Sequence, residues 1–188
     1  MQPSLYFPLQ KQVRITSDTL SFRTIDLAQT TEIPLGAHPG AFGAYRKYHR
    51  HEGVDLYGLE GDTVFALHSG TVVAKLPFTG AAAGSTWWLD TECVLVECEL
   101  GVFNYGEISP VAGLGVGDSI QAGEPVGTII PVLRVDKGRP RTMLHFERYH
   151  KGTRKPVETW ALDEPQPSCL LDPTELLVKA TKHIQGIE

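Results

Sequence analysis

Hydrophobic positions along this chain mostly alternate with polar ones over short runs, and glycine-containing turns separate the runs. Alternation with a period of two is typical of β-strands that bury one face. We expect hairpins at Ser69-Gly70 and at Gly101, a turn at Gly123, and a hairpin or strand pair formed by the first two runs. The predicted strands cover residues 13–16, 20–25, 63–66, 71–75, 93–99, 102–105, 119–121, 125–130 and 142–149.

The pattern changes from period two to a helical period near the end of the chain. Residues 172–175 combine an aspartate suited to the N-cap, a proline at the first helical position and a glutamate at the third. The stripe that follows consists of Leu176, Leu177, Ala180 and Ile184. We therefore expect a C-terminal helix that covers a sheet, after a long irregular connection over residues 151–168. Together the elements predict an all-β domain with antiparallel strands and one helix.

Composition narrows the class of partner. Hydrophobic residues make up 41% of the 188 positions, which is enough for a buried core. Lys and Arg number 17 against 22 Asp and Glu, a net charge of −5, so no basic surface points to nucleic acid or to an anionic membrane. No run approaches the roughly 18 apolar residues of a transmembrane helix. The first 12 residues carry no recognisable secretory signal, and the sequence leaves compartment and oligomeric state open.

Cysteine usage gives no disulfide framework. The three cysteines are Cys93, Cys98 and Cys169. Cys93 and Cys98 lie five residues apart in one predicted strand and therefore on opposite faces, where they are poorly placed to pair. We expect reduced thiols.

The segment His51-Glu52-Gly53-Val54-Asp55 is the first candidate for chemistry. Histidine nitrogen and carboxylate oxygen both suit zinc, but on a regular strand these two side chains would stand about 13 Å apart. Two ligands of one zinc ion must approach to about 3–4 Å, so the chain must bend, and Gly53 is the residue that permits a bend. The alternative is that His51 and Asp55 are solvated residues of a surface loop.

The last predicted strand holds the second candidate. Met143, His145 and Glu147 point to one side of this strand, whereas Leu144 and Phe146 point to the other. With the apolar side in the core, His145 faces a cleft or solvent beside an acid. It could supply a third zinc ligand and leave a fourth position for water. The alternative is a surface histidine paired with Glu147.

The order of these pieces along the chain resembles one known family. The succession resembles the lysostaphin-type (LytM-like) zinc metallopeptidases, metallopeptidase family 23, which cut peptide cross-bridges of bacterial cell walls and usually work outside the cytoplasm. The resemblance implies an antiparallel two-sheet hybrid barrel or sandwich over residues 35–150. N-terminal strands (1–34) would pack on this core, and an irregular connection with a helix (151–188) would follow it. The segments that carry the resemblance are 42–43, 51–55, 61–66, 70–72, 105–109, 117–123, 126–127 and 144–147.

The resemblance also implies a set of functional residues. It makes His51, Asp55 and His145 the ligands of a zinc cofactor, and it implies a peptide or peptidoglycan-like ligand. Tyr45 resembles a tyrosine that family members place near the transition state, although a packing aromatic on a loop is the alternative. Glu147 would support His145 from behind.

Two departures from the family pattern bear on activity. The family uses two further histidines beside the metal, and the matching positions here hold Glu107 and Met143. Methionine has no basic nitrogen, so Met143 cannot transfer a proton, and an anionic Glu107 cannot donate a hydrogen bond to an oxyanion. Loss of one oxyanion donor costs about 2.7–4 kcal/mol, and loss of general base catalysis costs about 10²–10⁴ in rate. We therefore expect a degenerate member whose peptidase activity is impaired or lost.

Two alternatives remain open from the sequence. The chain could be an active zinc endopeptidase that uses Glu107 as its base, as glutamate acts in other zinc peptidases. It could also be a carrier domain of the biotinyl or lipoyl type, because its glycine-punctuated strands resemble such half-barrels. That alternative requires a modifiable lysine at a hairpin tip, and the nearest lysine, Lys75, lacks the usual flanking residues.

Overall fold

The computed structural model describes residues 5–136 and 138–184. Two short 3-10 helices cover Ser21–Arg23 and Ala81–Ala83, and one α-helix, α1, covers Thr174–Ile184. The strands in this part of the chain are β1 (Gln12–Thr16), β2 (Thr30–Pro34), β3 (His49–Arg50), β4 (Val54–Tyr57), β5 (Thr63–Phe65), β6 (Gly70–Thr79), β7 (Thr91–Cys98), β8 (Gly101–Pro110), β9 (Ser119–Ile120), β10 (Pro125–Ile129), β11 (Met143–Tyr149), β12 (Trp160–Ala161) and β13 (Leu170–Leu171).

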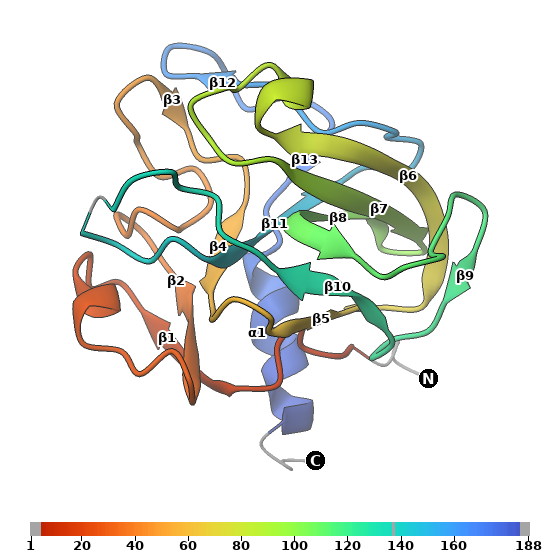
Figure 1. The fold of residues 1–188 in the computed structure, drawn as a ribbon, viewed down its shortest axis with the longest axis horizontal. Coiled ribbons are helices and arrows are strands. Elements are labelled where there is room, and N and C mark those ends of the chain that lie inside the picture. Colours follow the sequence, from red (N-terminus) through yellow and green to blue (C-terminus); the bar gives the residue numbers. More distant parts are fainter. Residues whose placement is uncertain (1–4, 137, 185–188) are drawn as a thin grey trace.

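One large sheet organises the molecule (Figure 1). Its neighbouring strands run in the order β13, β11, β8, β7, β6 and β9, while β4 pairs with β11 and β10 joins β8 to β5. All of these pairs are antiparallel, and within the described residues the sheet does not close into a barrel. Two small sheets, β1 with β2 and β3 with β12, lie beside it. The predicted all-β, antiparallel fold with a C-terminal helix is confirmed.

The main buried core contains side chains of the large sheet, of the N-terminal segment and of α1. Phe103 and Tyr105 of β8 pack against Phe146 of β11, with ring centroids 5.5 Å and 5.2 Å apart. Leu177 and Ala180 of α1 are fully buried in the same core, as the apolar stripe predicts. The side chain of Ile184, the last residue of that stripe, lies outside the described part of the structure.

The N-terminal segment shares this core. Phe7 and Leu9 are fully buried in it, and the backbone N–H of Phe65 in β5 donates to the carbonyl of Pro8 at 2.9 Å. The division of the chain at residues 34 and 150 stays a prediction.

The predicted strand over residues 20–25 is wrong, because a 3-10 helix lies there. The carboxylate of Asp18 accepts the backbone N–H of Leu20 at 3.0 Å, and the carbonyl of Asp18 accepts the N–H of Ser21. These local bonds turn the chain before a second strand can form. The partner of β1 is instead β2, and the two strands run parallel.

The hairpin predicted at Ser69-Gly70 is also wrong. β5 pairs with β10, and β6 pairs with β7 and β9. Gly70 is required for a different reason, since a Cβ there would collide with the carbonyl oxygen of Glu97. The hairpin at Gly101 is confirmed, because this residue pairs with Cys98 between β7 and β8.

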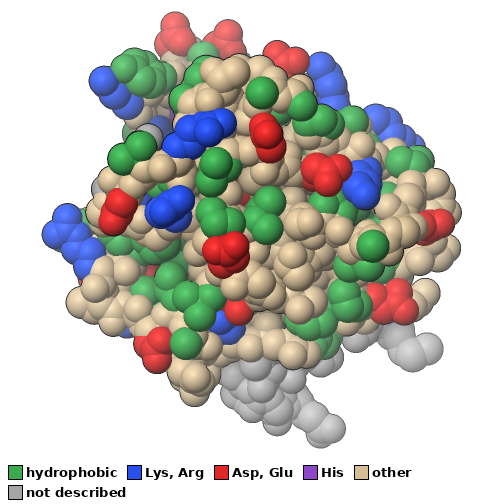
Figure 2. All heavy atoms as spheres, viewed as in Figure 1, with side chains coloured by type: hydrophobic (Ala, Val, Ile, Leu, Met, Phe, Trp, Pro, Cys, Tyr) green, Lys and Arg blue, Asp and Glu red, His purple; other side chains and the backbone are tan. Residues whose placement is uncertain are grey.

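The surface carries no large single-sign field on the face seen in Figure 2, where acidic and basic side chains are interspersed among scattered hydrophobic ones. All three cysteines are free, and Cys93 and Cys98 are buried. Among the described helices none is both long enough and apolar enough to span a bilayer.

Candidate metal centre

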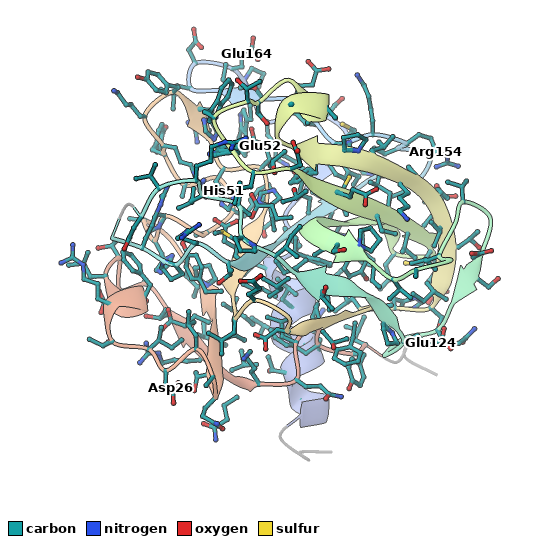
Figure 3. All side chains as sticks on the ribbon, in the orientation of Figure 1. Asp26, His51, Glu52, Glu124, Arg154 and Glu164 are labelled. Atoms are coloured by element: carbon teal, nitrogen blue, oxygen red, sulfur yellow. The ribbon has the colours of Figure 1, made fainter. Side chains whose placement is uncertain are left out.

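Three side chains from two distant segments of the chain converge at the junction of β4 and β11. Asp55 of β4 pairs directly with His145 of β11, and His51 lies just after β3. Oδ1 of Asp55 lies 2.9 Å from Nδ1 of His145 and 3.1 Å from Nε2 of His51, and the two ring nitrogens are 3.1 Å apart. Figure 3 shows His51 in the middle of the molecule beside β4, far from the peripheral Asp26 and Arg154. One ion can therefore contact all three atoms.

Gly53 makes this convergence possible. The chain between β3 and β4 crosses close over β11, and a Cβ on Gly53 would lie 2.7 Å from the carbonyl oxygen of Phe146 and 2.9 Å from Nε2 of His145. The expected bend between His51 and Asp55 is present. Gly53 does not have a positive φ, so a glycine is needed here for the close approach of the chain to β11 and not for a left-handed backbone.

Hydrogen bonds fix the orientation of both imidazoles. Nδ1–H of His51 donates to the carbonyl of Ala41 at 2.9 Å, and Nε2–H of His145 donates to Oε1 of Glu147 at 3.1 Å. The other carboxylate oxygen of Glu147 accepts a hydrogen bond from Asn104. Nε2 of His51 and Nδ1 of His145 are therefore the nitrogens that face Asp55 and that a proton or a metal ion can occupy. The bond from His145 to Glu147 has the form of the carboxylate–histidine pairs that support metal ligands.

Burial and charge give the cluster its electrostatic character. Burial lowers the pKa of His51 to about 4, so this ring is neutral near pH 7. Burial opposes protonation of His145 too, but hydrogen bonds to Asp55 and Glu147 outweigh it and raise the pKa of His145 well above its usual value. Burial would raise the pKa of Asp55, yet His51 and Arg46 hold it well below its ordinary value. The cluster therefore attracts one positive charge, and its two nitrogens and one oxygen suit zinc.

Arg46 is a member of the site that the sequence did not reveal. Its Nη2 donates to Oδ2 of Asp55 at 2.7 Å and to the carbonyl of Pro39 at 2.9 Å. This contact occupies one carboxylate oxygen and leaves Oδ1 for the two histidines. No spacing or periodicity near Arg46 marks it, because the contact depends on how a loop folds back on β4.

Comparison with known proteins identifies the architecture. No family model matches the chain, and no curated protein matches it in sequence. Among solved structures, a Ruminococcus gnavus protein assigned as a LytM glycyl-glycine endopeptidase is 17% identical with a TM-score of 0.53, over 96% of this chain and 61% of that one. The antimicrobial peptidase lysostaphin from Staphylococcus simulans is 21% identical with a TM-score of 0.52, over 74% of this chain and 49% of that one. This chain has the lysostaphin-type, LytM-like fold.

In this LytM-like fold, Glu107 occupies an unusual position. It is the one non-glycine residue with a positive φ, 65°, in the described part of the chain, and it lies where the β7–β8 register shifts. Its side chain is buried and Oε2 has no hydrogen-bond partner. Burial raises the pKa of Glu107 to about 7, with nearby His145 opposing the shift and Asp55 adding to it. Strained and unpaired groups of this kind concentrate at functional sites.

Met143 and Tyr45 lie differently with respect to the three candidate ligands. Met143 is buried in β11 opposite Tyr57 and on the same side of the strand as His145. Tyr45 is 70% exposed, and its ring and hydroxyl both contact Arg50, whose guanidinium carbon lies 4.1 Å from the ring centroid. The described contacts of Tyr45 thus connect it to a loop neighbour and not to the ligand cluster.

The position of Lys75 in the LytM-like fold does not support the carrier-domain alternative. Lys75 lies inside β6 and pairs with Val94 of β7. A lysine within a paired strand does not have the hairpin-tip position that a carrier domain requires.

Proposed function

We propose that this protein binds a zinc ion through His51, Asp55 and His145 and takes a peptide of the bacterial cell-wall kind as its ligand, with peptidase activity impaired or lost. The observation that carries the metal site is the approach of three donor atoms to 2.9–3.1 Å of one another. Both histidines are buried, and the outer nitrogen of each ring is bonded to an oxygen, so the inner nitrogen is the one that a metal ion can occupy. Without a proton or a cation between them, these atoms would repel one another.

The peptide ligand follows from the architecture and from the charge of the site. The two structural neighbours are a peptidase and a protein assigned as a glycyl-glycine endopeptidase. When bound, a zinc ion supplies a Lewis acid that polarises a carbonyl or activates water. Two neutral histidines and one carboxylate would leave it a formal charge of +1, which favours a carbonyl or carboxylate oxygen at the open position.

The reduced activity follows from two side chains. Met143 neither donates a hydrogen bond nor transfers a proton. Glu107 can donate a hydrogen bond when it is neutral or accept a proton when it is ionised, but it cannot do both at once, so these two side chains do not replace the two histidines that the family places beside the metal. Tyr45 is held by Arg50 at the surface and does not compensate in this arrangement. Binding of a peptide without efficient cleavage is the function that these residues favour.

A second candidate is a slow hydrolase in which Glu107 accepts the proton of the attacking water. The positive φ of Glu107 and its unpaired Oε2 favour this candidate. In this case the backbone strain at Glu107 would serve to aim its carboxylate at the open face of the metal.

Release of amines from cell-wall peptides tests the two candidates in one assay. The wild type is expected to release none, while the double variant Glu107→His with Met143→His gains turnover that a chelator abolishes. If the wild type instead turns over and Glu107→Gln abolishes that activity, the hydrolase candidate replaces the binding one. Glu60→Gln, at an exposed position outside the site, is the matched control.

A further inference from the structure

Three consecutive carbonyls support the candidate metal ligands from one side. The carbonyl of Pro39 accepts a hydrogen bond from Nη2 of Arg46 at 2.9 Å. The carbonyl of Gly40 accepts the backbone N–H of Asp55, and the carbonyl of Ala41 accepts Nδ1–H of His51, each at 2.9 Å. Arg46 in turn contacts Asp55. The position of this short turn therefore determines where two of the three candidate ligands stand.

The turn is also packed tightly against one ligand. A Cβ on Gly40 would lie 3.2 Å from Cβ of Asp55 and 3.4 Å from its carbonyl oxygen. Because no space separates Gly40 from Asp55, a displacement of the turn must move the carboxylate as well.

A buried hydrogen-bond chain attaches this turn to the N-terminal segment. The backbone N–H of Gly40 donates to Nδ1 of His38 at 3.0 Å, so the ring proton lies on Nε2, which is 3.3 Å from Oγ of Ser21. The hydroxyl of Ser21 donates to Oε2 of Glu32 at 2.6 Å. His38, Ser21 and Glu32 are all buried.

The hydrogen-bond chain ends in an ion pair between Arg14 and Glu32. Nε of Arg14 in β1 donates to Oε1 of Glu32 in β2 at 2.7 Å, which compensates a carboxylate that has no exposed surface. The direction of these hydrogen bonds also excludes one kind of chemistry. Nε2–H of His38 donates to Oγ of Ser21, so this nitrogen cannot accept the hydroxyl proton of Ser21. Ser21 is therefore no nucleophile activated by His38, and the network is free to serve as a support.

We propose that His38, held by Ser21 and Glu32, is a positioning residue for the metal site, so that the N-terminal segment 12–34 helps to set metal affinity. The proposal rests on the proposed metal binding by His51, Asp55 and His145. It assigns the N-terminal strands a role at the site, although none of their residues belongs to the ligand set. Loss of the hydrogen bonds that link Gly40 to Glu32 would let the turn at residues 39–41 move and would increase the distances between the three ligand atoms.

The test compares two variants of this hydrogen-bond chain with a matched control in the full chain. Ser21→Ala removes the hydroxyl in the middle of this hydrogen-bond series. In His38→Asn the side-chain oxygen can still accept the backbone N–H of Gly40, but the shorter side chain cannot reach Ser21. Thr181→Val is the control, because it removes another hydroxyl hydrogen bond of a buried residue, in which Oγ1 of Thr181 donates to the carbonyl of Val178 in α1 at 2.8 Å, outside the N-terminal segment and the ligand cluster. Zinc affinity is measured by competition with a chromophoric chelator, and ligand geometry by the visible absorption of bound Co²⁺.

We expect Ser21→Ala and His38→Asn each to weaken zinc binding by about tenfold and to change the Co²⁺ spectrum, as loss of a partner behind a metal ligand does. Thr181→Val should keep the wild-type affinity and spectrum. Wild-type affinity in both Ser21→Ala and His38→Asn would overturn the proposal, as would an equal loss in Thr181→Val. A wild-type chain that binds no metal would overturn the proposed function and this inference with it.

Discussion

Nε2 of His51 lies 3.1 Å from Nδ1 of His145, although 94 positions separate the two residues in the chain. The two histidines come together because β4 pairs with β11 and because the chain at Gly53 passes close over β11. Each ring also has its second nitrogen bonded to an oxygen, which leaves the facing nitrogens free to bind a cation. The properties of this pair lead to the following predictions.

Replacement of Glu147 by Gln should weaken zinc binding by about tenfold, because it removes the charge that orients His145 and raises its basicity. The variant keeps the shape of the side chain, so the fold should persist. Chelator competition measures the effect. Glu97→Gln, on β7 and bonded to Arg154 at the surface, is the control and should bind zinc as the wild type does. Equal affinities in Glu147→Gln and the wild type would contradict the role of Glu147.

Replacement of Gly53 by Ala should lower both stability and zinc affinity. The added Cβ would press on the carbonyl of Phe146 and on the ring of His145, and such overpacking typically costs about 1–3 kcal/mol. Gly36→Ala is the matched control, since its φ of 61° imposes a strain of about 1–2 kcal/mol while no atom lies near its Cβ. Urea unfolding and zinc titration of both variants separate the two effects. If Gly53→Ala and Gly36→Ala bind zinc equally well, Gly53 does not position the site.

The buried carboxyl of Glu107 should make the metal-free protein less stable as pH rises. Burial raises its pKa in the folded state to about 7 from 4.5, so the folded state holds a proton that the unfolded state has released. The resulting stabilisation is complete below pH 4.5 and is lost as pH rises through 7, by about 3 kcal/mol at most. His51 acts in the opposite direction over part of this range, because its folded-state pKa is lowered to about 4.

A difference measurement isolates the contribution of Glu107. The free energy of unfolding of the metal-free wild type, minus that of Glu107→Gln, should fall between pH 4.5 and 7. Glu60→Gln, at an exposed position, should follow the wild type throughout. A difference that stays constant with pH would show that Glu107 is not held in its neutral form.

Much of the site follows from the sequence because strand alternation is local. The same-face relation of His145 and Glu147 needs only the period of β11, and the structure has Nε2 of His145 bonded to Glu147. The hairpin at Gly101 and the C-terminal helix likewise depend on residues near each other in the chain. Recognition of the family pattern supplied the link between His51, Asp55 and His145, which spacing alone leaves open.

The missed features depend on contacts between distant segments. The partner of β5 is β10, roughly sixty residues later, so the local turn signal at Gly70 was misleading. The sequence did not predict β2, because this strand carries the charged residue Glu32, whose burial depends on hydrogen bonds from Arg14 and Ser21. Arg46 and His38 lie in loops, where no periodicity shows which way a side chain turns.

The most direct test of the metal site is the metal content of the purified protein and of its His51→Ala and His145→Ala variants. After incubation with zinc and removal of the excess, elemental analysis should find one equivalent in the wild type and little in either variant. His68→Ala, a histidine outside the cluster that lies near Glu99, should retain the full equivalent. A wild type without zinc, or variants that retain it, would contradict the assignment of His51, Asp55 and His145 as its ligands.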